Sequence, residues 1–149
     1  MPQPGLQTPS AKHRGKREPT EAELAALAEF RAALREFLAF SEQAAAARGA
    51  TMQWYQALLV IKTFNSDAPI TVGELAEQLR IRHHSAVGLV SRLSAAKLVR
   101  RQQDAGDRRR SLLLMTAAGE RCLADLAAAH LERLREIEDS FLKPFRVEP

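Results

Sequence analysis

The chain has 149 residues, the length of one ordinary domain with tails. Apolar residues make up 46% of it and charged residues 27%, which is typical of a globular protein. Its apolar runs are far shorter than the roughly 20 residues that span a bilayer, and a single cysteine excludes an internal disulfide. No secretory signal is visible in the first residues. Composition therefore excludes membrane, collagen-like and disulfide-stabilised classes, and we expect a cytoplasmic, helix-rich domain without membrane contact.

The positive charge is concentrated in two segments. The formal net charge is +4, but residues 80–110 alone carry nine Lys or Arg against two Asp. Residues 1–18 carry four Lys or Arg against one Glu, so the rest of the chain is net negative. A basic block in an otherwise acidic chain attracts a phosphate backbone, although a solvated charged face has the same composition. Whether residues 80–110 bind phosphates or are only a solvated face depends on the secondary structure that they form.

The N-terminal half predicts a tail and two helices. Residues 1–18 are polar, basic and without period, which predicts a disordered tail. Thr20 and Glu23 form a capping-box pattern that opens a long amphipathic helix within 19–50, with Gly49 as its left-handed cap. Thr51 is positioned to cap the next helix.

The segment 51–115 predicts a compact unit of helices followed by a hairpin. Thr71 and Glu74 form a second capping box before a short helix, and a tight break at 80–82 precedes another helix. In that helix four apolar residues share one face at helical spacing: Ala86, Leu89, Val90 and Leu93. Residues 98–103 and 111–115 have strand composition and flank a polar turn with a glycine. The fold class is therefore mainly α with a small β-hairpin.

The segment 116–149 predicts a last long helix and a tail. Thr116 is its expected cap, and the helix should fray around 140–144. Its apolar stripe is expected at five positions: Leu123, Leu126, Leu131, Leu134 and Ile137.

The order of these elements is that of a winged helix-turn-helix, and from Thr51 to Gly119 the chain resembles the MarR family of bacterial transcriptional regulators. The similar strings are TVGELAEQLRI, SAVGLVSRLSAAKLV and RRQQDAGDRRRSLLLMTAAG. The resemblance implies a sequence-specific DNA-binding regulator, a repressor, that binds a pseudo-palindromic operator as a homodimer. It further implies long terminal dimerisation helices and release by a small aromatic or lipophilic effector, although no group of residues marks a pocket for one.

Two departures from the family pattern concern local geometry. Arg82 stands where the family usually has a Ser, Thr or Asp cap, so Ser85 is expected to cap the recognition helix instead. Lys97 replaces the customary glycine before Leu98, and a positive φ there would cost of the order of 1 kcal/mol. The chain also has room for only one long C-terminal helix where the family usually has two.

The candidate DNA-binding residues lie on the recognition helix and in the turn of the hairpin, the wing. A helix with Ala86 and Leu89 inward presents its opposite face to the major groove. Val87 there either contacts a thymine methyl or is a tolerated surface valine, and Gly88 reflects either close approach to DNA or drift. The helix candidates are His83, His84, Ser85, Val87, Gly88, Ser91 and Arg92.

For the wing, the resemblance implies that Arg109 enters the minor groove while Asp107 pairs with it and holds it extended. A narrow A·T-rich minor groove concentrates negative potential and attracts a guanidinium. Arg108 and Arg110 are expected to neutralise neighbouring phosphates.

The dimer interface is expected on the two terminal helices, because one winged helix is too small to cover them. The candidate interface residues are Leu27, Leu34, Leu131 and Leu134.

Other classes of function are less well supported. No phosphate-binding loop, GxSxG or HExxH motif is present, so we expect neither an enzyme nor a cofactor. Adjacent His83 and His84 point about 100° apart on a helix, so no metal site is expected. Cys122 is either a small buried hydrophobe or a redox-sensing thiol. The main alternative is a winged helix that docks on another protein without specific DNA binding.

Overall fold

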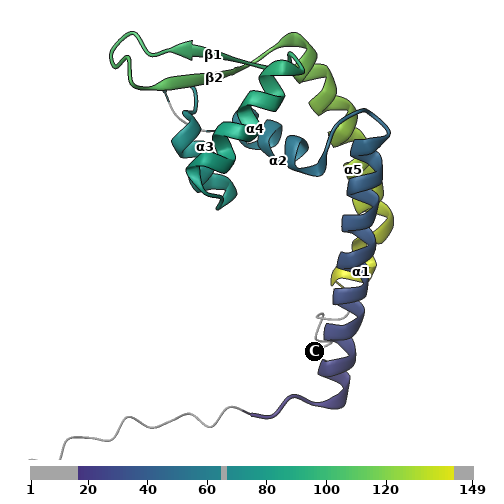
Figure 1. Cartoon of the computed structure of the whole chain (residues 1–149). Helices are drawn as coiled ribbons and strands as arrows, with labels where there is room; N and C mark the ends of the chain where they lie inside the picture. The colour runs from purple at the N-terminus through teal and green to yellow at the C-terminus, as the bar shows by residue number, and fades with distance from the viewer. Residues whose placement is uncertain (1–16, 65–66, 143–149) are drawn as a thin grey trace, which may run out of the picture.

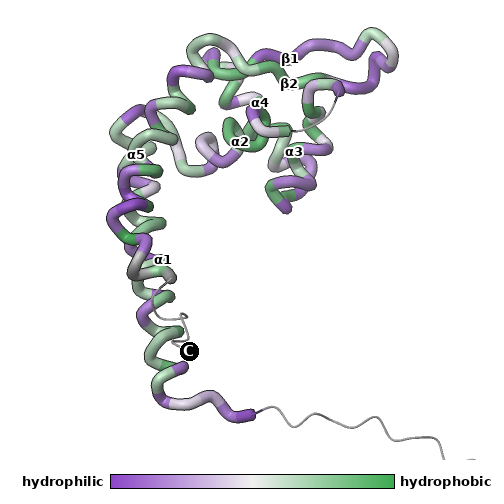
Figure 2. Tube along the Cα trace, turned by 180° about the vertical axis from the view of Figure 1, so that it is seen from behind, coloured by the Kyte–Doolittle hydropathy of each residue, from purple (hydrophilic) through white to green (hydrophobic). Residues whose placement is uncertain are grey.

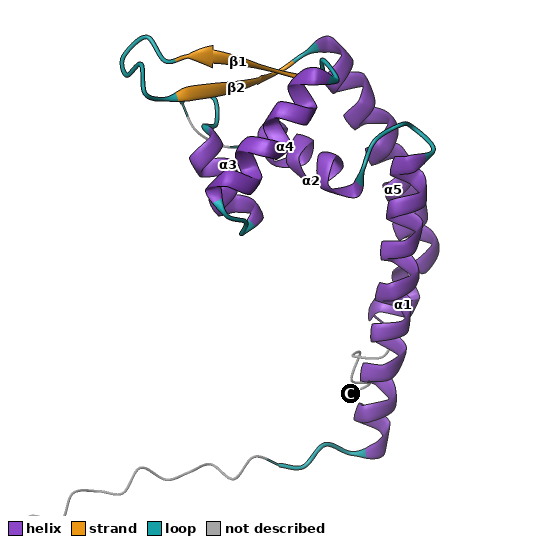
Figure 3. Ribbon diagram, viewed as in Figure 1, coloured by secondary structure: helices purple, strands orange, loops and turns teal. Residues whose placement is uncertain are grey.

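The computed structural model describes residues 17–64 and 67–142, and Figure 1 shows a lobe carried at one end of a long two-helix arm. Helices α1 and α5 lie side by side along the arm, whereas α2, α3, α4 and the two strands form the lobe (Figure 3). The elements, in chain order, are α1 (Glu21–Ala46), α2 (Met52–Thr63), α3 (Val72–Leu79), α4 (His83–Ala95), β1 (Val99–Gln103), β2 (Ser111–Met115) and α5 (Ala117–Leu142). The predicted class, mainly α with a small hairpin and long terminal helices, is confirmed.

The helix starts follow from local hydrogen bonds. Both predicted capping boxes are present, because the Thr20 and Thr71 hydroxyls accept from the N–H of Glu23 and Glu74 while those carboxylates accept from the threonine N–H. Thr51 and Thr116 cap α2 and α5 in the simpler way: each hydroxyl accepts from the N–H three residues on. Each bond satisfies an N–H that a helix start would otherwise leave unpaired.

Two helix ends use the left-handed conformation at non-glycine residues. Arg80 ends α3 with φ 54°, and Lys97 follows α4 with φ 60°, while Gly49 after α1 has φ 66°. Lys97 therefore bears the cost expected for a side chain in this region. The expected Ser85 cap is wrong: the N-cap of α4 is Arg82, which makes no side-chain capping bond, and Ser85 lies inside the helix. The chain turns into α4 directly from the break at 80–82, so the helix starts before the serine is reached.

The wing is an antiparallel hairpin that is joined to the start of α3. Val99 pairs with Met115 and Gln103 with Ser111 across the ladder. On its other edge β2 forms a short bridge between Leu112 and Thr71. The sequence pattern did not reveal this bridge, which fixes the wing relative to α3.

One apolar core holds the lobe together. It contains the four inward residues of α4 predicted above, which are fully buried, with Leu58 of α2, Leu75 of α3 and Leu113 of β2. Figure 2 shows hydrophobic colouring on the lobe helices and on β2, while β1 and the stretch that leads into β2 are hydrophilic. A second cluster, of Ala45, Ala50 and Leu126, lies where the arm meets the lobe.

The inward line of α5 differs from the predicted leucine stripe. Leu123 and Leu126 are buried, but Leu131 and Leu134 are 52% and 40% exposed. His130 occupies the inward position one turn after Leu126 and is only 3% exposed. Because a helix repeats every 3.6 residues, the buried line continues through 130 and 137, and the leucines at 131 and 134 fall beside it.

His130 sits in an aromatic cluster that joins three helices. Its ring stacks on Tyr55 of α2 with centroids 4.2 Å apart and meets Phe37 and Phe40 of α1 edge-on. The Nδ1–H of His130 donates to the Leu126 carbonyl at 2.6 Å. In the neutral ring Nε2 therefore accepts, and its donor is the hydroxyl of Ser41 on α1. Burial in this cluster raises the pKa of the Tyr55 hydroxyl. His130 of α5 therefore contacts both α1 of the arm and α2 of the lobe.

Candidate nucleic-acid interface

The outward face of α4 carries the predicted recognition residues. His83, His84, Ser91 and Arg92 are exposed, Val87 is 36% exposed, and Ser85 and Gly88 are half-buried. A face with these side chains presents donors, a cation and one apolar contact to any partner that covers it. Their contact with DNA stays a prediction.

Gly88 is not required by packing. A Cβ built there would meet only the Arg92 Nη1 atom, at 3.6 Å, which is ordinary van der Waals contact. Since an interior helical glycine costs about 0.5–1 kcal/mol relative to alanine, folding alone gives no reason for it.

The wing tip is shaped by two aspartates that bind main-chain N–H groups. Asp104 Oδ1 accepts from Gly106 N–H at 2.9 Å, and Asp107 Oδ1 accepts from Arg109 N–H at 3.0 Å. Within residues 17–64 and 67–142, no ion pair joins the side chains of Asp107 and Arg109. The expected pairing is therefore corrected: Asp107 holds the backbone of Arg109 through an Asx-turn, which short carboxylates commonly form.

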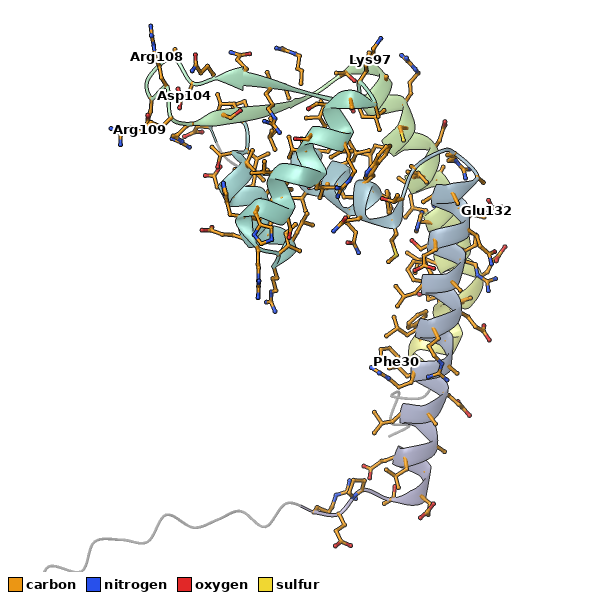
Figure 4. All side chains as sticks on the ribbon, in the orientation of Figure 1. Phe30, Lys97, Asp104, Arg108, Arg109 and Glu132 are labelled. Atoms are coloured by element: carbon orange, nitrogen blue, oxygen red, sulfur yellow. The ribbon has the colours of Figure 1, made fainter. Side chains whose placement is uncertain are left out.

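The three wing arginines are not equivalent. Arg108 and Arg109 lie at the hairpin tip (Figure 4), and both are exposed. Arg110 lies between two carboxylates, 3.9 Å from Glu74 and 3.8 Å from Asp104. These distances are long for ion pairs and the groups are partly exposed, so the attraction is weak. Arg110 is nevertheless partly neutralised, whereas Arg108 and Arg109 have no such neighbour in the described part of the chain.

The recognition helix, the wing and the start of α3 meet around one groove of about 330 Å³. Four basic side chains line it, contributed by α4, β1 and the wing: His83, Arg101, Arg109 and Arg110. The other lining residues are Thr71, Val72, Gly73, Val87 and Ser111. The groove therefore joins two segments singled out separately in the sequence, the recognition helix and the wing, into one continuous basic surface.

Sequence reasoning missed two parts of this surface. Arg101 was hidden in a strand whose composition indicated only a β-hairpin, and the first turn of α3 was assigned only a capping role. Strand alternation is the signal that would have found Arg101, because it lies two residues from buried Val99 on the same face of β1.

A metal or thiol function receives no support from the described residues. Among them no group of three or more His, Cys, Asp or Glu side chains is arranged to hold a metal ion. Cys122 is half-buried against both apolar clusters, and burial together with Asp125 raises the pKa of its thiol. A raised thiol pKa lowers the fraction of reactive thiolate and favours the packing role.

The predicted interface leucines fall on the arm. Leu27, Leu131 and Leu134 are exposed by 40% or more, while Leu34 is half-buried. A shallow groove of about 260 Å³ is lined by Leu131, Leu134, Arg135, Glu138 and Phe141. Among the described residues, no helix is long and apolar enough to cross a membrane.

Residues 48–110 match the model of the MarR family. The fold is similar to AbsC, a MarR family transcriptional regulator from Streptomyces coelicolor, with 22% identity, 89% of this chain and 86% of that chain covered, and a TM-score of 0.67. It is also similar to Staphylococcus aureus MepR in a DNA complex, with 21% identity, 82% and 85% covered, and a TM-score of 0.66. A comparison with curated proteins found no match.

The fold is that of a winged helix-turn-helix lobe on an arm of two long helices. The match to the MarR family of transcriptional regulators, over residues 48–110, covers α2, α3, α4 and β1 of that lobe.

Proposed function

We propose that this chain is a sequence-specific DNA-binding regulator in which α4 enters the major groove and the wing tip the adjacent minor groove. The observation that carries the proposal is the basic groove between α4 and the wing, lined by four basic side chains. Its neighbours Val87 and Ser91 supply an apolar contact and a polar contact on the same face. A surface of this chemistry fits phosphates at its basic edge and base edges along the helix.

The wing contributes a positioned arginine. Asp107 fixes the main chain at Arg109, so the guanidinium leaves the hairpin tip in a defined direction. An arginine held in this way fits a narrow, A·T-rich minor groove, where the negative potential is greatest. Arg108 supplies charge to the phosphates beside it, as does Arg110 to a smaller extent.

We further propose that two chains assemble through their arms. Exposed leucines on α1 and α5 leave an apolar face that one protomer does not cover: Leu24, Leu27, Leu38, Leu131 and Leu134. A two-fold dimer would present two recognition helices to half-sites about 10 base pairs apart, so the operator is expected to be pseudo-palindromic. Binding over a promoter would exclude the polymerase, which makes repression in the bacterial cytoplasm the simplest consequence.

A small aromatic or lipophilic effector would bind in the arm. Between α1 and α5 lies a hollow of about 360 Å³ whose lining includes Phe40, Arg48 and Arg133. Arg133 is stacked over Phe40 at 5.9 Å, and among the described residues its buried Nε has no hydrogen-bond partner. A carboxylate on an aromatic ring would satisfy that N–H. Sodium benzoate is the simplest probe, and it should raise the melting temperature of the wild type but not of Arg133→Met.

The experiment that tests the function is selection of duplexes from a random library by the full chain. Fluorescence anisotropy then compares the selected duplex with a scrambled duplex at several salt concentrations. We expect a preference of roughly a thousandfold or more and a steep loss of affinity with salt. Equal, weak binding to both duplexes would overturn the proposal and favour the alternative of a protein-docking winged helix.

A further inference from the structure

Strand β1 places one arginine against the recognition helix and its neighbour on the opposite face. Side chains alternate along a strand, so Arg101 shares the face of buried Val99, while Arg100 shares the face of Gln102. Arg100 Nη1 donates to the Gln102 side chain at 3.3 Å, along its own strand. Arg101 instead reaches across to α4. The two arginines are therefore matched in type, strand and exposure, but differ in what they contact.

Arg101 is tied to the outward face of α4 by one terminal nitrogen. Its Nη2 donates to Ser91 Oγ at 3.0 Å and, more weakly, to the Val87 carbonyl at 3.4 Å. The side chain remains exposed and lines the basic groove. Among the described residues, its Nη1 and Nε have no hydrogen-bond partner. The guanidinium is thus fixed at one corner and has three N–H donors free.

The same contacts change what Ser91 can do. Its hydroxyl donates to the Val87 carbonyl at 2.9 Å and accepts from Arg101. A serine hydroxyl has a single proton, so Ser91 has no donor left for a base edge. At this point of the surface the available donors belong to Arg101.

We propose that Arg101 is a specificity-determining residue of the DNA interface and that Ser91 positions it. The inference rests on the proposed function, because it concerns the same surface. A guanidinium held beside the recognition helix can donate from its free Nη1 to the N7 acceptor of a guanine in the major groove, the base that arginine most commonly contacts there. Ser91 and the Val87 carbonyl reduce the rotamer freedom that a long side chain loses on binding. Arg101 thereby joins the wing strand and the recognition helix in reading one base pair.

The test uses the duplex selected by the wild type, a scrambled duplex and the matched pair Arg101→Ala and Arg100→Ala. Arg101→Ala should weaken binding to the selected duplex about 10- to 100-fold and to the scrambled duplex only a few-fold. Arg100→Ala should weaken both duplexes equally and only a few-fold. Arg101→Lys restores the charge but not the planar guanidinium that Ser91 holds in place, so it should recover scrambled binding and leave most of the selected loss.

A base analogue tests for a contact with a base, because its effect on affinity does not depend on the charge of the protein surface. Replacing guanines one at a time by 7-deazaguanine removes the N7 acceptor. The wild type should lose affinity at the guanine that Arg101 contacts, and Arg101→Ala should be insensitive at that same position. The positioning role predicts that Ser91→Ala weakens selected binding less than Arg101→Ala does, and that the double variant loses less than the product of the two losses.

The outcomes separate the inference from the function on which it rests. If the wild type selects a duplex but the two arginine variants behave alike on both duplexes, Arg101 is only a surface charge and the inference is overturned. If the losses from Ser91→Ala and Arg101→Ala multiply, Ser91 reads DNA independently and the positioning role is wrong. If the wild type selects no duplex at all, the proposed function fails and this inference with it. Circular dichroism melting should be unchanged in all variants, because the side chains of Ser91, Arg100 and Arg101 are all exposed.

Discussion

The Ser41 hydroxyl and the His130 Nε2 atom, 89 residues apart in the chain, lie 2.7 Å apart in a buried hydrogen bond between α1 and α5. Both residues are 3% exposed, so neither polar group has water as an alternative partner. The bond therefore joins the two helices of the arm, and the stack of Tyr55 on the same histidine connects the arm to α2 of the lobe.

Ser41→Ala should destabilise the fold by about 1–3 kcal/mol, because it leaves the buried Nε2 of His130 without a partner. Urea unfolding followed by circular dichroism measures this. Ser94→Ala is the matched control, since the buried Ser94 hydroxyl has no hydrogen-bond partner within residues 17–64 and 67–142. Removing it should be neutral or slightly stabilising. Equal losses in the two variants would show that the histidine contact contributes nothing specific.

Acid should weaken the fold partly through Glu74. Hydrogen bonds from Thr71, with a smaller contribution from Arg110, hold the pKa of the Glu74 carboxyl below its ordinary value near 4.5. A lowered folded-state pKa means that its stabilisation is complete above the unfolded value and is lost as pH falls through the folded one. Glu74→Gln should therefore flatten the loss of stability between about pH 5 and 3, measured by urea unfolding at each pH. Glu77→Gln, at an exposed site on the same helix, should leave the wild-type slope unchanged.

Two glycines should respond to alanine in opposite directions. A Cβ at Gly119 would lie 2.1 Å from the Leu98 carbonyl oxygen, so Gly119→Ala forces the start of α5 away from the wing. We expect a loss of about 1–3 kcal/mol in thermal unfolding. A Cβ at Gly88 makes only ordinary van der Waals contact with the Arg92 side chain, so Gly88→Ala should be neutral or stabilise by up to about 1 kcal/mol. It should nevertheless weaken DNA binding if the backbone approaches the duplex closely. Destabilisation by Gly88→Ala would contradict the packing around that residue.

The exposed leucines predict self-association. Sedimentation at micromolar concentration should give a species of about twice the 16.5 kDa chain mass. Leu27→Lys combined with Leu131→Lys should shift the protein to the monomer, because burying two charged side chains in an apolar interface is unfavourable. Val87→Lys, which adds one lysine on the lobe instead, should remain dimeric. If the wild type sediments as a monomer, both the predicted dimer and the predicted pseudo-palindromic operator are wrong.

The lobe was predictable because its signals are local. Capping threonines, the break at 80–82 and the inward face of α4 each depend on residues a few positions apart, where spacing dictates geometry. The turn chemistry of the wing was visible for the same reason. Its detail was not, because an Asp two residues before an Arg fits a side-chain ion pair and a main-chain Asx-turn equally well.

The features missed from the sequence depend on contacts between distant elements. His130 stands among apolar residues of α5, and nothing nearby shows that it faces Ser41 and Tyr55 rather than solvent. The expected apolar stripe contained Leu131 and Leu134, which lie beside the inward line, and left out His130. Arg101 gains its significance only when β1 packs beside α4, and Arg110 only when the wing meets Glu74.

A double-mutant cycle on the wing tests whether α4 and the wing together form one DNA-reading surface. On the selected duplex, Arg109→Ala should cost about 1–3 kcal/mol of binding free energy by anisotropy. Asp107→Ala should lose part of the same energy through the released turn, and the double variant should lose less than the sum. Arg108→Ala is the control, with a smaller, sequence-independent loss and a salt slope reduced by about one charge.

Hydroxyl-radical footprinting of the same duplex is the decisive measurement. The wild type is predicted to protect the minor groove at both outer ends of a pseudo-palindromic site, and Arg109→Ala to lose that protection while the major-groove contacts of α4 remain. Additive, purely salt-dependent losses for Arg108 and Arg109, with no change in the minor-groove footprint, would contradict the account and leave α4 as the only reader of sequence.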